Sequence, residues 1–236
     1  MKFRGYCLLA ILFASINIFA QKQDLTIENI YAKGEFSTKS FGPARWLADG
    51  SGYTTLEPSM KTNGRDIVKY NPETGERLIL VSASSLVPKG EEKPLSITDY
   101  TWSDDGEKLL IFTNTRRVWR YHTRGDYWIL NLRTEKLQQI GKKLKATTLQ
   151  FAKFSPNSKK VAFVSEQNIY VEDLDSENTT SLTSDGVDNI VNGTFDWVYE
   201  EELNLRDGIR WSPDSKKIAY WQMDTEGIGT FYMVNN

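Results

Sequence analysis

The sequence contains a single cysteine and a single histidine among its 236 residues. Cys7 lies within the first twenty residues, so the rest of the chain can form no disulfide, thiolate metal site or cysteine nucleophile. A Ser-His-Asp triad would need His122, and no strained serine turn lies near it. The sequence also has no Gly-x-Ser-x-Gly elbow, no phosphate-binding glycine loop and no His/Cys cluster with metal-ligand spacing. The chain alone therefore shows no catalytic, cofactor-binding or metal-binding motif.

Positive charge is not in excess either. The chain has 29 Lys and Arg residues against 31 Asp and Glu residues, which gives a net charge of −2. Nothing in this balance would neutralise phosphates, so the composition argues against a nucleic-acid partner. Aromatic residues, in contrast, reach 12%, and flat side chains of this kind pack well on pleated sheets. The composition therefore favours an all-β protein.

The first twenty residues have the layout of a secretory signal peptide. Lys2 and Arg4 precede an apolar run from Cys7 to Phe19, and Ala20 is followed by a polar chain. The run is shorter than the roughly 20 residues that cross a bilayer comfortably. We expect cleavage after residue 20 and an exported protein, periplasmic or secreted. Export without disulfides favours a bacterial envelope. A membrane anchor formed by the uncleaved segment is the alternative.

Four segments of the chain resemble one another: each has an aromatic residue, a tight polar turn and an apolar strand. They begin at Trp46, Trp102, Phe154 and Trp211, which are 56, 52 and 57 residues apart. The last two turns contain Ser-Pro-Asn/Asp-Ser, where Pro presets φ and Asn or Asp bonds its own backbone. This period is close to that of one four-stranded propeller blade. The sequence predicts a partial β-propeller of about four blades over residues 46–236, after a lead-in segment over residues 21–45. A non-repeating β-sandwich is the alternative.

Further strands are expected between these turns, over residues 66–70, 77–80, 126–130 and 168–171. A last strand is expected over residues 229–234, running into the final two residues without a closing element. Propellers protect their sheet edges by closing the ring. The pattern therefore favours a propeller that continues beyond this sequence, with a complete four-bladed ring as the alternative.

An acidic run, Glu200 to Glu202, interrupts the repeat. Its ordinary interpretation is a solvated acidic loop. Trp197 and Tyr199 lie beside it, however, and aromatic neighbours suggest partial burial, where carboxylates need a cationic partner. An α-ammonium group is such a partner, because its three N–H donors can make charge-assisted bonds to two carboxylates.

Arg120 is the second candidate binding residue. It follows a strand and stands between Trp119 and Tyr121. Its planar guanidinium could bind two carboxylates or a carbonyl oxygen, whereas simple stacking on its aromatic neighbours is the ordinary interpretation. The neighbouring His122, a lone exposed histidine, is expected to be neither a ligand nor a base.

The run Asp-Trp-Val-Tyr-Glu-Glu-Glu at 196–202 resembles the double-glutamate signature of the dipeptidyl peptidase IV family of serine peptidases. Trp119-Arg120 is similar to the Trp-Arg site of the same family. The resemblance covers residues 25–236 and implies the first half of an eight-bladed propeller. It implies that Glu201 and Glu202 bind the free amino terminus of a peptide. Arg120 would orient these carboxylates and contact the carbonyl group of the amino-terminal residue, while Glu200 is expected to be structural or solvated.

The resemblance also implies an exported enzyme that releases X-Pro or X-Ala dipeptides, in a family where homodimers are common. The sequence departs from the family because the rest of the propeller and the α/β-hydrolase domain, with its serine, aspartate, histidine and oxyanion tyrosine, are missing from it. We therefore expect a fragment that is inactive alone. The alternatives are a stand-alone propeller that binds peptides or protein partners, and a prolyl oligopeptidase relative of different specificity.

Overall fold

The computed structural model describes residues 25–38, 41–229 and 232. The chain divides into two compact units, residues 1–40 and 41–236. The described part of the first unit contains one π-helical turn, η1 (Glu28–Ala32). The expected signal peptide lies outside the described residues, and so does most of the strand expected over residues 229–234. In the part that is described, no helix has the length and apolar character needed to cross a bilayer.

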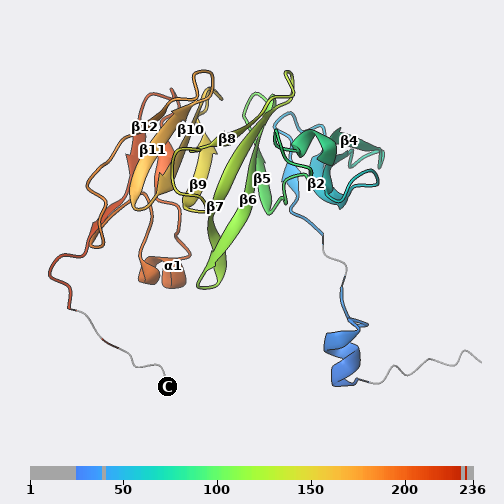
Figure 1. Ribbon diagram of the computed structural model, residues 1–236, viewed down its shortest axis with the longest axis horizontal. Helices are drawn as coiled ribbons and strands as arrows, with labels where there is room; N and C mark the ends of the chain where they lie inside the picture. The colour runs from blue at the N-terminus through green and yellow to red at the C-terminus, as the bar shows by residue number, and fades with distance from the viewer. Residues whose placement is uncertain (1–24, 39–40, 230–231, 233–236) are drawn as a thin grey trace, which may run out of the picture. The chain divides into compact units, whose positions relative to one another are not determined.

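The second unit is built from antiparallel strands, and within each of the first three blades neighbouring strands follow one another in sequence (Figure 1). The first blade contains β1 (Arg45–Trp46), β2 (Tyr53–Pro58), β3 (Arg65–Tyr70) and β4 (Arg77–Val81), followed by a short 3-10 helix, η2 (Ala83–Leu86). The second contains β5 (Asp99–Trp102), β6 (Lys108–Val118), β7 (Tyr121–Asn131) and β8 (Leu137–Ile140). The third contains β9 (Leu149–Phe154), β10 (Lys160–Ser165), β11 (Asn168–Asp173) and β12 (Thr179–Ser181).

The fourth blade is divided into two strand pairs. Its strands are β13 (Ile190–Asn192), β14 (Ile209–Trp211), β15 (Ile218–Tyr220) and β16 (Gln222–Asp224), with the helix α1 (Trp197–Leu203) between β13 and β14. β13 pairs with β16, and β14 pairs with β15. A single backbone pairing, Gly125 with Leu149, also joins β7 of the second blade to β9 of the third.

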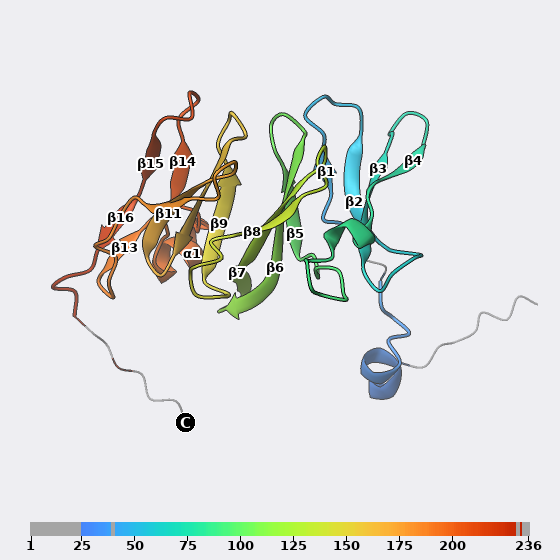
Figure 2. The same ribbon diagram turned by 45° about the horizontal axis from the view of Figure 1, so that its top comes forward.

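The predicted fold class is confirmed: the chain is an all-β protein with a partial β-propeller. The strands expected over residues 66–70, 77–80, 126–130 and 168–171 lie within β3, β4, β7 and β11. Each of the four aromatic-turn segments forms an antiparallel pair: β1 with β2, β5 with β6, β9 with β10, and β14 with β15. The described sheets do not close into a ring (Figure 2).

The predicted turns share one hydrogen-bond pattern. In the third blade, the Ser155 hydroxyl accepts from a backbone amide five residues later at 3.0 Å and donates to the Asn157 side chain at 2.8 Å. The same two contacts recur at Ser103 and Ser212. The Ser215 hydroxyl also accepts from the Asn157 backbone amide at 3.0 Å, so one turn binds the turn of the preceding blade. Local turn chemistry thus also helps to align neighbouring blades.

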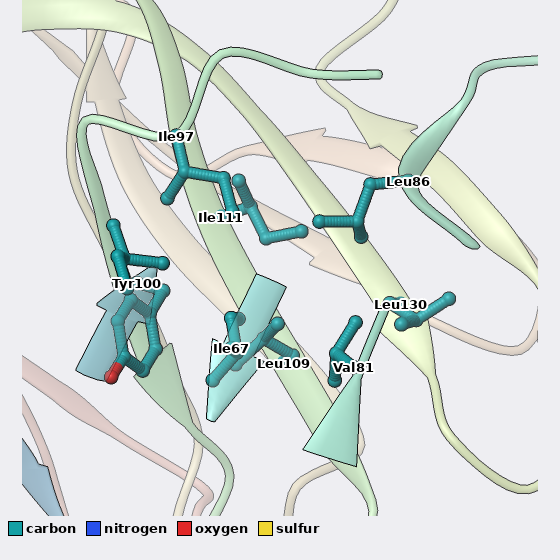
Figure 3. Packing of buried hydrophobic residues seen from close by; sticks show 9 residues of the cluster. Ile67, Val81, Leu86, Ile97, Tyr100, Leu109, Ile111 and Leu130 are labelled. Atoms are coloured by element: carbon teal, nitrogen blue, oxygen red, sulfur yellow. The ribbon is translucent and has the colours of Figure 1, made fainter. Parts of the chain in front are cut away.

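The hydrophobic core lies between successive blades. The cluster between the first and second blades is shown in Figure 3 and contains Leu56, Ile67, Val81, Leu86, Ile97, Tyr100, Leu109, Ile111 and Leu130. Strand β6 is buried on both faces, because Leu109 and Ile111 enter this cluster whereas Leu110 and Phe112 enter the next one. The apolar run in this strand therefore contributes to two cores. A third cluster, Ala162, Val164, Ile169 and Ile209, joins the third blade to the fourth.

A three-membered ion-pair group also connects the second and third blades. The Lys136 and Lys142 ammonium groups lie 2.7 and 2.8 Å from the two carboxylate oxygens of Glu177. Hydrogen bonds from Lys136 and, to a smaller extent, from Lys142 lower the pKa of Glu177 from 4.5 to about 2. A carboxylate whose pKa is lowered by folding contributes stability above its unfolded pKa and loses it as the pH falls through the folded value.

We expect the free energy of unfolding of the wild-type chain to decrease more steeply between pH 4.5 and pH 2 than that of Glu177→Gln. Urea unfolding of both proteins across this range measures the difference. The difference should shrink at high salt, because both lysine side chains are about half exposed and their charges are screened. Parallel pH profiles for the two proteins would contradict the expectation.

Candidate functional site

The acidic run lies on the short helix α1. The Asp196 side chain accepts a hydrogen bond from the Tyr199 backbone amide at 3.0 Å and caps the first turn. Glu200 stands in that first turn, where a negative charge favours the positive end of the helix dipole. Asn204 ends the helix in the left-handed conformation, with φ of 54°. Local sequence therefore favours a helical turn here instead of the solvated loop that an acidic run ordinarily forms.

Arg120 stands at the tip of the long β6–β7 hairpin. Val118 and Tyr121 are paired across the two strands, so Trp119 and Arg120 form the connecting turn. Trp119 takes the left-handed conformation that such a turn needs, with φ of 55°. Both strands have eleven residues, which lets the hairpin extend until its tip lies beside α1 (Figure 1).

The structure brings together two of the three site residues predicted from the sequence. The Arg120 guanidinium lies 3.2 Å from the Glu201 carboxylate, although the two residues are 81 positions apart. The Glu201 side chain is only 15% exposed, whereas that of Arg120 is 73% exposed. Glu202 follows on the same helix; it is exposed and forms no ion pair with any described residue. Among Arg120, Glu201 and Glu202, the carboxylates therefore outnumber the cation by one.

A second bridge between the same two elements involves a residue that the sequence analysis missed. The Arg206 Nε atom lies 3.1 Å from the Glu200 carboxylate, and its guanidinium carbon lies 3.7 Å from the centre of the Tyr121 ring. The side chains of Arg206 and Glu200 are about one-fifth exposed. Of the two roles expected for Glu200, structural or solvated, its ion pair with Arg206 favours the first. No spacing rule identifies Arg206, because its contacts depend on the hairpin lying beside the helix.

His122 has a local contact only. Its Nδ1 atom lies 2.8 Å from the Thr115 hydroxyl on the opposite strand of the hairpin, and the side chain is exposed. Within residues 25–38, 41–229 and 232, no three His, Cys, Asp or Glu side chains come together in a way that could hold a metal ion.

Trp119 and Glu200, the immediate sequence neighbours of Arg120 and Glu201, line a small cavity. Its volume is about 190 Å³, and its lining includes Trp119 and Arg124 of the hairpin, Gln150 and Gln167 of the third blade, and Trp197 and Glu200 of α1. The site thus combines a carboxylate held by an arginine, a second exposed carboxylate and a polar cavity. Such an arrangement can bind an ammonium group through charge-assisted hydrogen bonds.

Much of the chain is similar to known proteins. Residues 103–236 match the family described as the dipeptidyl peptidase IV N-terminal region. The chain is 31% identical over 185 residues to a probable dipeptidyl-aminopeptidase B of Aspergillus oryzae, which covers 78% of this chain and 20% of that protein. It is 32% identical over 209 residues to the mouse prolyl endopeptidase FAP, which covers 88% of this chain and 25% of that protein.

A solved structure is similar as well. The crystal structure of Porphyromonas gingivalis dipeptidyl peptidase 4 matches with a TM-score of 0.74 and 27% sequence identity, over 88% of this chain and 28% of that one. The chain therefore spans about a fifth to a quarter of the length of the curated relatives above.

Proposed function

Because the chain belongs to the dipeptidyl peptidase IV family, we propose that its propeller segment binds the free amino terminus of a peptide substrate. The observation that carries the proposal is the Arg120–Glu201 ion pair, which joins the hairpin of the second blade to α1. Glu201 and Glu202 accept hydrogen bonds from the α-ammonium group. Arg120 orients Glu201 and donates to the carbonyl oxygen of the amino-terminal residue.

We further propose that this sequence belongs to a longer, exported serine dipeptidyl peptidase, with residues 1–20 as its signal peptide and the nucleophile outside these 236 residues. Anchoring the amine fixes how many residues of the peptide reach the nucleophile, so that the cut follows the second residue. The related proteins named as dipeptidyl aminopeptidases support this reading.

A second candidate function, internal cleavage next to proline, is favoured by the match to a protein named as a prolyl endopeptidase. Internal cleavage needs no free amine near the scissile bond. The two functions therefore differ in whether blocking the amino terminus of the ligand matters.

Binding of a peptide and its blocked counterpart tests the proposal. We expect the full chain to bind Gly-Pro-amide on the order of tenfold or more tightly than N-acetyl-Gly-Pro-amide, because acetylation removes the charge and its hydrogen bonds. Titrations followed by NMR chemical shifts measure both affinities, even when they are weak. Equal affinity for the two ligands would contradict amine recognition and favour the second candidate.

A further inference from the structure

The β6–β7 hairpin carries positive charge that the described residues do not neutralise. Arg116 and Arg124 are direct partners across the two strands, and both are exposed. Neither forms an ion pair with any residue in the described part of the chain. Like charges directly opposite each other destabilise an antiparallel pair. The arrangement is therefore unfavourable for the strands themselves, and an anion bound beside either arginine would relieve the repulsion.

Of these two arginines, only Arg124 lines the cavity beside the Arg120–Glu201 pair. The cavity extends from the tip of the hairpin at Trp119 to Gln150 and Gln167 of the third blade. Sites for whole small ligands usually measure about 300–1,000 Å³. The volume here, about 190 Å³, is smaller and suits one side chain or end group of a ligand whose remainder lies outside.

The charges that line this cavity leave Arg124 uncompensated. Arg206 lies in the same wall, but Glu200 neutralises it at 3.1 Å. Gln150 and Gln167 are neutral and can donate amide hydrogen bonds. A guanidinium group with free N–H donors binds a carboxylate strongly, often through two parallel hydrogen bonds. The cavity is therefore positive and rich in donors. It lies next to Arg120, Glu201 and Glu202, which together form an amine clamp with one excess negative charge.

We propose that Arg124 makes this cavity a subsite for a carboxylate of the bound peptide. The inference rests on the proposed function, because the amine held at Glu201 and Glu202 is what places the carboxylate beside Arg124. A short peptide has two sources of this group. One is the side chain of an amino-terminal Asp or Glu, and the other is the terminal carboxylate of a released dipeptide. The site then recognises an ammonium and a carboxylate group in the same ligand.

Two pairs of ligands separate these sources. The first pair is Glu-Pro-amide and Gln-Pro-amide, which have nearly the same shape and differ in the side-chain charge. The second pair is Gly-Pro with a free carboxylate and Gly-Pro-amide. In NMR titrations of the full chain, we expect the charged member of one pair to bind roughly tenfold or more tightly than its neutral counterpart. The pair that shows the preference identifies the source.

The variant Arg124→Gln should abolish this preference while still binding Gly-Pro-amide more tightly than N-acetyl-Gly-Pro-amide. Retained discrimination against the acetylated peptide shows that the fold and the amine clamp are intact in the variant. Arg116→Gln is the matched control: it makes the same change in the cross-strand partner, which does not line the cavity. This control should keep the preference for the charged ligand.

Two outcomes would overturn the subsite. One is equal binding within both ligand pairs in the wild-type chain, and the other is a preference that survives in Arg124→Gln. The N-acetylated forms of Glu-Pro-amide and Gln-Pro-amide separate this failure from failure of the amine clamp. If acetylation has no effect and the acidic ligand is still preferred, the proposed function falls, and Arg124 then binds the carboxylate without the positioning by the amine that is proposed here. If acetylation weakens binding and a charge on the ligand side chain or terminus does not change the affinity, the proposed function stands and the subsite falls.

Discussion

Glu201→Gln should weaken the binding of Gly-Pro-amide by roughly 30-fold or more, because losing one partner of a desolvated charge pair costs about 2 kcal/mol or more. The Glu201 side chain is mostly buried and is held by Arg120 at 3.2 Å, so water cannot readily compensate for the loss of its charge. Glutamine keeps the size of the side chain but removes the negative charge. NMR titration of the variant with Gly-Pro-amide and its N-acetyl form measures the loss.

Two further variants make this result specific. Glu202→Gln should also weaken amine binding, but less than Glu201→Gln, because Glu202 is exposed and water can compensate for its charge. Glu226→Gln changes an exposed carboxylate outside the site and should have no effect. If Glu201→Gln still discriminates between the free and the acetylated peptide as the wild type does, the clamp is not at Glu201.

The largest expected loss of stability follows from truncation of a side chain between two blades. Ile111→Ala should reduce the free energy of unfolding by about 2–5 kcal/mol, because it removes fully buried methyl groups and leaves a cavity. Ile111 is 0% exposed and packs in the cluster that joins the first and second blades (Figure 3). Urea unfolding gives the change as a shift of the midpoint at constant slope.

The same substitution at a surface position is the matched control. Ile79 of β4 is 43% exposed, so Ile79→Ala should cost less than about 1 kcal/mol. Equal effects at the two positions would show that packing between the first two blades does not limit the stability of the chain. Ile111→Ala should bind Gly-Pro-amide as tightly as the wild type wherever it remains folded, because its side chain lies in the core and not in the site.

The repeat was predictable from the sequence because its information is local. The Ser155 turn places an aromatic residue, a capping hydroxyl and an Asn within a few positions, and the structure shows the Ser155 hydroxyl bonded to the Asn157 side chain and to the Lys160 backbone amide. The pairing of β13 with β16 had no such signal, because these strands are about thirty residues apart and α1 lies between them. The family resemblance named Arg120 and Glu201 together, and no local pattern relates two residues 81 positions apart.

Arg206 and Arg124 could not be identified from the sequence for a related reason. Arg206 matters because the Tyr121 ring and the Glu200 carboxylate meet it from two separate elements. Arg124 looks like an ordinary exposed strand residue until the third blade and α1 enclose a cavity around it. The sequence thus indicated where charged groups occur, whereas tertiary packing determines which of them face each other.

The contact between Arg120 and Glu201 joins the second blade to the fourth and passes over the third. The distance between the two side chains therefore depends on the angles at which the third blade holds the second and the fourth blade. Chains built from repeats readily accommodate the gain or loss of a whole unit. Here, duplication or deletion of the third blade would move the arginine away from the glutamate even if every blade still folded. The site can vary through single substitutions, but the number of blades between its two halves is fixed.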